Sequence, residues 1–227
     1  MNVEDGLKPL VKICGCGAKV EVANEFTPGI CRKCIDERQK ELDELNQQAA
    51  HREEQKQEQE RQRRAAMVPK RYQHIESDRK DILRTATPHK SFYIWGDTGT
   101  GKTVLAASIA RKYSDIRWES CPALIMKLQS MYRSESQSPH EYALTVAHTP
   151  GLLVLDDLGA EKLTEFVRQT TYFILNEREQ HLLPVVITSN LNLADIDKII
   201  DKRVSSRIAG MCEVIALKGA DRRLDRA

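Results

Sequence analysis

The chain has no run of apolar residues long enough to cross a membrane, which takes about 18 or more in succession. Residues 1–11 include Glu4 and Asp5 and lack the continuous apolar segment of a secretory signal peptide. We therefore expect a cytoplasmic protein with no membrane-spanning helix. Thiols stay reduced in that compartment, so the few cysteines, six in all, are expected to bind metal or to pack in the core rather than to form disulfides.

An excess of charge of either sign is also missing. The 227 residues carry 35 Lys and Arg against 33 Asp and Glu, a net charge of +2. This balance neither requires nor excludes a nucleic-acid partner. Aromatic residues make up only 5% of the chain, and no stacking platform for single-stranded bases can be identified. The 41% hydrophobic and 30% charged fractions suggest one domain of ordinary size with a charged segment outside its core.

Four of the six cysteines lie close together near the N-terminus, and residues 1–35 are predicted to form a small zinc-binding module. The pairs have the form Cys-x-Cys and Cys-x₂-Cys, with 14 residues between them. They bracket a hairpin-like stretch, residues 18–29, and glycines next to the first pair permit a tight turn around a metal. A Cys₄ tetrahedral zinc site needs such spacing. The alternative is a disordered tail with reduced thiols. The predicted zinc ligands are Cys14, Cys16, Cys31 and Cys34.

Residues 36–68 contain neither Gly nor Pro and consist almost entirely of charged and polar helix formers. Apolar positions are too few to sustain a heptad seam. The segment is predicted to be a solvated, partly frayed helical linker. A short coiled coil or a helix that docks a partner is the alternative interpretation.

Residues 69–227 alternate between apolar strands and helices. This alternation predicts a parallel sheet covered by helices on both faces, the α/β class. The expected strands are residues 91–95, 116–120, 152–157, 184–190 and 212–217. The expected helices are residues 103–113, 122–133, 164–180, 193–200 and 203–210.

The strongest functional motif is GDTGTGKT, which fits the phosphate-binding P-loop pattern and lies between a predicted strand and a predicted helix. Its glycines let backbone N–H groups point inward, and the N-terminus of the following helix attracts anions. Lys102 can reach the β- and γ-phosphates of ATP, and the Thr103 hydroxyl can ligate Mg²⁺. The predicted nucleotide-binding residues are Gly96, Asp97, Thr98, Gly99, Thr100, Gly101, Lys102 and Thr103.

Two further strands end in polar side chains. In open α/β sheets, ligands bind at the carboxyl ends of the strands. Asp156 and Asp157 follow the apolar run LLVL, so Asp156 is predicted to ligate Mg²⁺ and Asp157 to polarise the attacking water. Asn190 follows the strand VVITS and can hold that water or contact the γ-phosphate. Helix capping and turn formation are the alternative roles for these residues.

Together, GDTGTGKT, LLVLDD, TSN and RVSSRI in this order resemble AAA+ ATPases. More narrowly they resemble the branch that unites DnaC-type helicase loaders with IstB-type transposition helper ATPases. The segments LLVLDDLG, ITSNLNL and KRVSSRI and the terminal Gly219-Ala220-Asp221-Arg222-Arg223 carry the narrower resemblance. It covers roughly residues 67–224.

The resemblance implies roles for three arginines. Arg207 matches the arginine finger that completes a neighbour's site, Arg203 lies one helical turn earlier, and Arg223 matches the terminal arginine of the nucleotide site. A finger acting in trans implies a homo-oligomer. Surface arginines on a short helix are the alternative. The sequence stops at Ala227 without a C-terminal helical lid domain, as in both branches of the resemblance.

The resemblance also implies an ATPase that loads a replicative helicase onto single-stranded DNA, with the zinc module contacting the helicase. Lys127 and Arg133 are candidate contacts for DNA. A transposition helper acting on duplex DNA is an alternative, as is an adaptor in which ATP acts as a switch with negligible turnover. Asp157, where a glutamate is more usual, is compatible with slow hydrolysis.

Overall fold

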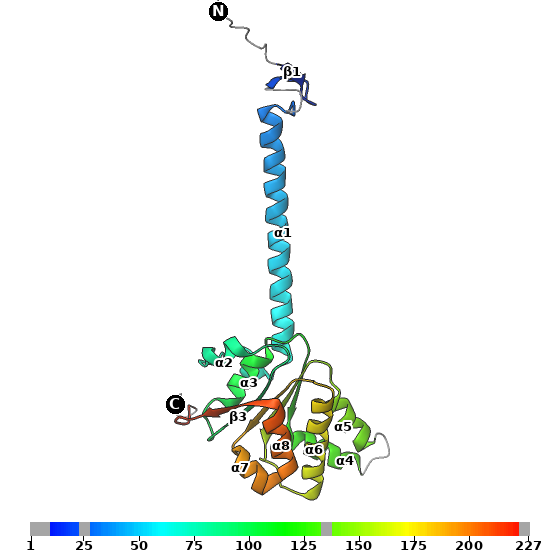
Figure 1. The fold of residues 1–227 in the computed structure, drawn as a ribbon, viewed down its shortest axis with the longest axis vertical. Helices are drawn as coiled ribbons and strands as arrows, with labels where there is room; N and C mark the ends of the chain where they lie inside the picture. Colours follow the sequence, from blue (N-terminus) through cyan, green and yellow to red (C-terminus); the bar gives the residue numbers. More distant parts are fainter. Residues whose placement is uncertain (1–9, 23–27, 133–137, 223–227) are drawn as a thin grey trace, which may run out of the picture. The chain divides into compact units, whose positions relative to one another are not determined.

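The computed structural model describes residues 10–22, 28–132 and 138–222 of the chain (Figure 1). The chain divides into two compact units, residues up to 58 and residues from 59 onward. Within the described residues, no helix combines the length and the apolar character needed to span a bilayer. The predicted boundaries at residues 35 and 68 remain predictions.

The first unit contains a short antiparallel hairpin of β1 (Leu10–Ile13) and β2 (Lys19–Val22). The Cys14 N–H donates to the Ala18 carbonyl at 2.8 Å and closes the turn, and Gly17 has a φ of 89° that favours glycine. The hairpin therefore lies earlier than the predicted 18–29 stretch. The first cysteine pair lies in its turn instead of preceding it, because Gly15 and Gly17 make that segment the tightest turn available.

Helix α1 (Arg32–Ala66) confirms the helical character predicted for the charged segment. Its side chains are almost all exposed, including Leu42 and Leu45. Pairs one turn apart stabilise it locally, such as the 2.9 Å hydrogen bond from Gln39 to Asp43. The helix begins at Arg32, before the predicted start at residue 36, so Cys34 lies in its first turn.

The second unit is built on a five-stranded parallel sheet in the order β4-β5-β6-β3-β7. The central strands are buried on both faces, which explains their continuous apolar runs. The predicted α/β class and parallel sheet are confirmed. The strands are β3 (Ser91–Gly96), β4 (Ile116–Ser120), β5 (Leu152–Leu158), β6 (Val185–Ser189) and β7 (Cys212–Leu217).

Helices cover both faces of this sheet and enclose two hydrophobic clusters. One face is covered by the segment containing the short 3₁₀ helix η1 (Lys70–Tyr72), α2 (Lys80–Thr85) and α3 (Lys102–Ala110). The other is covered by α4 (Cys121–Met131), α5 (Pro139–Ala147), α6 (Glu165–Gln180) and α8 (Lys202–Met211). Between β6 and α8 lie α7 (Leu193–Asp195) and the π-helical turn η2 (Ile196–Ile200). The predicted helices are present, and α2 and α5 are additional helices that the sequence pattern did not reveal.

Candidate nucleotide-binding site

The P-loop connects β3 to the N-terminus of α3, as the motif predicts. Gly96 has a φ of 154°, and a Cβ there would lie 2.1 Å from the Leu217 carbonyl oxygen at the end of β7. Gly99 has a φ of 79°, and a Cβ there would lie 1.7 Å from an Asp221 carboxylate oxygen. Gly96 therefore requires glycine, because a side chain would collide with the backbone of the neighbouring strand, while at Gly99 the positive φ favours glycine.

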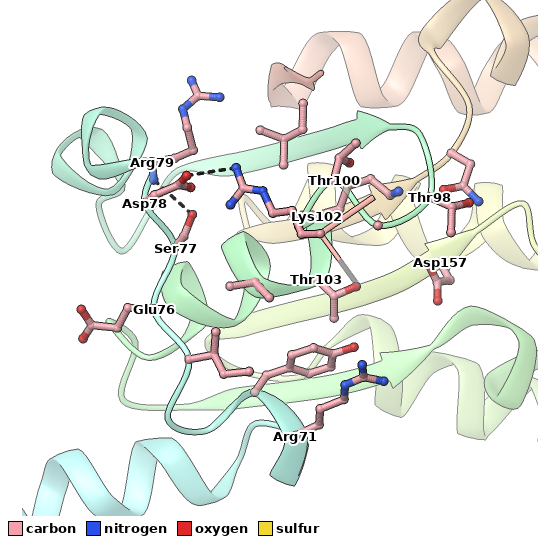
Figure 2. A pocket seen from close by; sticks show the side chains of 18 of the residues that line it. Arg71, Glu76, Ser77, Asp78, Arg79, Thr98, Thr100, Lys102, Thr103 and Asp157 are labelled. Atoms are coloured by element: carbon pink, nitrogen blue, oxygen red, sulfur yellow. Dashed lines mark hydrogen bonds and ion pairs between the residues drawn. The ribbon is translucent and has the colours of Figure 1, made fainter. Parts of the chain in front are cut away.

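Lys102 is buried at the start of α3, with only 6% of its surface exposed. Its ammonium group donates to the carbonyl oxygens of Gly96 at 2.9 Å and Asp97 at 2.8 Å. These bonds hold the charge inside the curve of the loop, as Figure 2 shows for the labelled Lys102. A positive group beside inward-facing backbone N–H groups at a helix N-terminus is suited to polyphosphate binding.

Asp156 lies beneath the loop at the end of β5 and is 8% exposed. One of its oxygens accepts hydrogen bonds from the hydroxyls of Thr103 at 3.1 Å and Thr188 at 2.6 Å. Burial is the main cause that raises the pKa of this carboxyl, and the hydroxyls oppose it. A hydroxyl oxygen and a buried carboxylate are oxygen donors of the kind that fits Mg²⁺.

Asp157 occupies a β-bulge, where the pairing of β5 with β6 shifts register between Leu155 and Leu158. Its φ of 60° is left-handed, and its N–H donates to the Thr188 hydroxyl at 2.9 Å. The bulge turns the side chain out of the sheet alternation, so the exposed Asp157 lines the pocket while Asp156 stays buried (Figure 2). Asn190, directly after β6, lines the same pocket.

The pocket has a volume of about 440 Å³, within the range of small-molecule and cofactor sites. Thr98 to Thr103 line it, while Gly96 and Asp97 contribute carbonyls to Lys102 and Asp156 lies behind Thr103. The structure thus brings together every nucleotide-site residue predicted from the P-loop, β5 and β6. Arg223 lies outside the described residues.

Sequence reasoning missed the opposite wall of this pocket, which residues 71–79 form together with Arg222. Arg111, the C-cap residue of α3, fixes this wall by donating to the carbonyls of Tyr72 at 2.6 Å and Ile75 at 2.8 Å. Arg222 donates its N–H to the Gly99 carbonyl at 3.1 Å and its guanidinium to Asp78 at 3.0 Å. That contact lowers the pKa of Asp78. Residues 71–79 carry no motif, because backbone carbonyls do most of their positioning, and in the terminal Gly219–Arg223 segment the resemblance pointed to Arg223 instead of Arg222.

Arg203 and Arg207 lie on α8 and are not among the residues that line the pocket. Arg203 is paired with Asp201 at 2.9 Å, and Arg207 is paired with Glu179 on α6. Both guanidinium groups lie over the Tyr172 ring, 4.9 and 5.8 Å from its centroid. They therefore form one arginine face, which we define as Arg203, Arg207 and Tyr172.

Of the candidate DNA contacts, Lys127 donates to the Tyr142 hydroxyl at 2.9 Å and lies 4.1 Å from the centroid of its ring. Its ammonium group is thus engaged within the unit. Arg133 lies outside the described residues.

The four N-terminal cysteines form a single cluster, with their sulfur atoms all within 4.8 Å of one another. Cys16 and Cys31 sulfurs are 3.4 Å apart, close to the roughly 3.8 Å expected between thiolates around a tetrahedral zinc with 2.3 Å bonds. N–H groups of Cys16 and Cys31, together with hydrogen bonds from the other thiols, lower the pKa of Cys14 to about 6. The arrangement fits a zinc ion.

Known proteins share both the sequence pattern and the fold of this chain. The family described as IstB-like ATP binding protein matches residues 42–227. Replicative helicase loader DnaI of Bacillus subtilis (strain 168) is 26% identical over 169 residues, covering 67% of this chain and 53% of that protein. The chain thus spans about half the length of this curated relative.

Crystal structures of two helicase loaders are similar to the chain. The DnaC helicase loader is 26% identical with a TM-score of 0.52, and the match covers 61% of this chain and 85% of that one. DnaI is 27% identical with a TM-score of 0.50, covering 63% and 80%. The predicted resemblance to the DnaC and IstB branch is confirmed, and with residues 42–227 matched the chain belongs to the family of IstB-like ATP-binding proteins.

Proposed function

We propose that this protein binds and hydrolyses ATP–Mg²⁺ and uses that cycle to load a replicative DNA helicase onto single-stranded DNA. The observation that carries the proposal is the preformed P-loop pocket in a chain whose similar proteins, DnaI and DnaC, are helicase loaders. A pocket alone would support only nucleotide binding, so the loader role depends on those relatives.

Within the pocket, each side chain has a proposed task. Lys102 and the loop N–H groups bind the β- and γ-phosphates, while Thr103 and Asp156 hold Mg²⁺, which neutralises charge on the phosphate oxygens. Asp157 and Asn190 orient the attacking water from adjacent strand ends. Arg222 is close enough to the loop, 3.9 Å from a Cβ built at Gly101, to sense whether phosphate is bound.

The arginine face is proposed to complete the site of a neighbouring protomer. Arg207 and Arg203 do not line their own pocket, and exposed ion pairs in water can be exchanged at little cost. ATP would then join protomers into a homo-oligomer, and hydrolysis would release them.

The Cys₄ cluster is proposed to hold one structural zinc, which would stabilise a module that contacts the helicase. A short hairpin and the first turn of α1 provide little buried core, so a metal is a reasonable source of folding energy.

Two alternatives compete with the loader. A transposition helper would belong to the same family, but the relatives with known roles above are helicase loaders. An adaptor with negligible turnover would keep the nucleotide site and lack hydrolysis. Helicase recovery on DNA tests the loader role itself, and measured ATP hydrolysis separates the loader from the adaptor.

The deciding experiment mixes the full chain with the replicative helicase of the encoding organism and closed circular single-stranded DNA. ATP should increase the helicase recovered on the circles. Lys102→Ala should not support this increase. The control Lys198→Ala, which removes an exposed lysine that does not line the pocket, should support it. Helicase recovery that is the same with and without the chain contradicts the loader. Loading that proceeds without measurable hydrolysis favours the adaptor.

The zinc assignment predicts one thiolate-bound metal ion per chain. After Co²⁺ replaces the native metal, thiolate-to-cobalt charge-transfer absorption should correspond to one site, and Cys31→Ser should remove most of it while leaving ATP binding unchanged. Cys212→Ala, which removes a thiol outside the cluster, is the matched control. Charge-transfer absorption well below half a site in the reduced wild-type chain contradicts a four-cysteine centre.

A further inference from the structure

A second cluster of metal-binding side chains lies in the ATPase unit, at the ends of α5 and α6. It consists of His148, Glu177 and His181, whose ligand atoms all lie within 4.8 Å of one another. His148 follows the last residue of α5, and Glu177 and His181 are one turn apart at the end of α6. The two helices pack against each other and lie side by side in Figure 1.

Hydrogen bonding accounts for only part of this arrangement. The His148 Nε2 lies 2.8 Å from a Glu177 oxygen, which is hydrogen-bond distance. The His181 Nε2 lies 3.8 Å from the same oxygen, too far for a hydrogen bond. The two rings are 4.8 Å apart, centroid to centroid. An ion between the three groups would engage all of them at once.

The backbone that carries the two histidines is held in place by Arg178, which is fully buried. Its guanidinium donates to the carbonyls of Ala147 at 3.0 Å, Thr149 at 2.8 Å and Gly151 at 2.6 Å, and also to Pro184. The Ala147 and Thr149 carbonyls lie on either side of His148 in the sequence, and the Pro184 carbonyl follows His181. The ligands are therefore preorganised by a buried side chain that is not itself a ligand.

The local field also favours a cation. His148 and His181 occupy the C-cap positions of α5 and α6, so the negative ends of two helix dipoles converge on the cluster. Glu177 adds a carboxylate. Side-chain exposures of 44%, 19% and 56% for His148, Glu177 and His181 leave an entry path for an ion.

We propose that His148, Glu177 and His181 bind one divalent transition-metal ion of the Zn²⁺ class, with water in the remaining position. Two imidazoles and one carboxylate are ligands that zinc accepts in proteins, and Mg²⁺ or Ca²⁺ would require more oxygen donors. The ion links the end of α5 to the end of α6. This site is independent of the four cysteines and of the nucleotide pocket.

The test counts zinc ions bound by the untagged full chain in equilibrium dialysis at neutral pH. Wild type should bind one zinc more than His148→Gln, His181→Gln or Glu177→Gln, each of which keeps the size of the side chain. Loss of a second-shell partner already costs about 10–100-fold in metal affinity, so loss of a ligand should cost at least about tenfold. His89→Gln, at an exposed histidine outside the cluster, should bind as wild type does.

Co²⁺ separates this site from the cysteines. The difference between wild type and His181→Gln should lie in weak visible bands without thiolate charge transfer. Far-ultraviolet circular dichroism and ATP binding verify that each variant is folded. Equal zinc stoichiometry and affinity in wild type, the three cluster variants and His89→Gln would overturn the proposal, as would a zinc difference that carries thiolate absorption.

Discussion

The nucleotide pocket and the arginine face belong to the same unit, but their charged side chains differ in burial and in bonding partners. In the pocket, Lys102 and Asp156 are buried and bonded by neutral groups, carbonyls for the ammonium and hydroxyls for the carboxylate. On the arginine face, Arg203 and Arg207 are partly exposed, and each is paired with a carboxylate.

The pocket is therefore suited to binding a charged ligand, whereas the charges of Arg203 and Arg207 are already neutralised by neighbouring carboxylates. Buried charges gain strongly when a counter-charge arrives, because the surrounding dielectric is low. Exposed ion pairs contribute about 0–1 kcal/mol and can change partners readily. The pocket should therefore respond strongly to ATP and Mg²⁺, while the arginines should move to a new anion with little loss of stability.

The largest effect on ATP affinity is expected for Lys102→Ala. Bonds to charged groups contribute about 1.5–3 kcal/mol each, so losing two phosphate contacts should weaken binding by about 10²–10⁴-fold. The fold should persist because the hydrogen bonds of the ammonium group go to the loop carbonyls of Gly96 and Asp97 and not to the hydrophobic core. Fluorescent-nucleotide titration measures the affinity, with Lys198→Ala as control. Unchanged binding would remove the P-loop assignment.

Arg207→Ala is expected to leave ATP affinity almost unchanged, because Arg207 does not line its own pocket. Hydrolysis should fall steeply, since arginine fingers are worth about 10³–10⁵ in rate. Steady-state phosphate release measures the effect. Arg84→Ala, at an exposed arginine of α2, is the control and should keep wild-type turnover.

Mixing Arg207→Ala with Lys102→Ala sharpens the test. Some interfaces of a mixed oligomer would pair an intact pocket with an intact finger, so part of the turnover should return. A single mutant with full activity, or a monomer that is fully active at every concentration, would defeat the trans-arginine role while leaving the nucleotide site intact.

A smaller effect is expected for Asp156→Asn on stability without ligand. Burial raises the pKa of Asp156, so the ionised form costs stability that the neutral form does not. The stability associated with the neutral form is present at low pH and is lost as pH rises through the raised pKa. Asp156→Asn should therefore match or exceed the wild-type melting temperature by up to a few degrees at neutral pH, with the difference shrinking in acid.

The same substitution should weaken Mg²⁺-dependent ATP binding by about 10–100-fold. Thermal melts with and without ATP–Mg²⁺ measure both effects on one sample. A variant that is strongly destabilised without ligand would show that the carboxylate is structural instead of a waiting metal ligand.

Much of the fold and the core of the nucleotide site could be predicted from sequence. The strands of the parallel sheet are continuous apolar runs, and the P-loop has a spacing that few other structures require. Asp156 and Asn190 were predicted to meet near the loop because carboxyl ends of parallel strands share one edge of the sheet.

The remaining features could not be predicted because they depend on non-local backbone contacts. Residues 71–79 contain no motif. Their place in the pocket wall follows from the hydrogen bonds of Arg111 to two of their carbonyls, which are 39 and 36 residues away in the sequence. The hairpin was expected between the two cysteine pairs, whereas β1 and β2 place the first pair in the turn itself, which the spacing of the cysteines does not reveal. The partnership of Arg207 with Glu179 joins two helices whose packing no local pattern reveals.

The left-handed backbone at Asp157 restricts which residues this position can accept over evolutionary time. Asparagine, aspartate and glycine tolerate such a conformation, whereas other L-residues pay about 1–2 kcal/mol. Of the tolerated three, only aspartate retains a negative charge. A glutamate would extend the carboxylate further toward bound phosphate but would strain the bulge. The shape of one strand end thus favours the shorter acid in this chain, and a glutamate would fit without strain only if the register between β5 and β6 also changed.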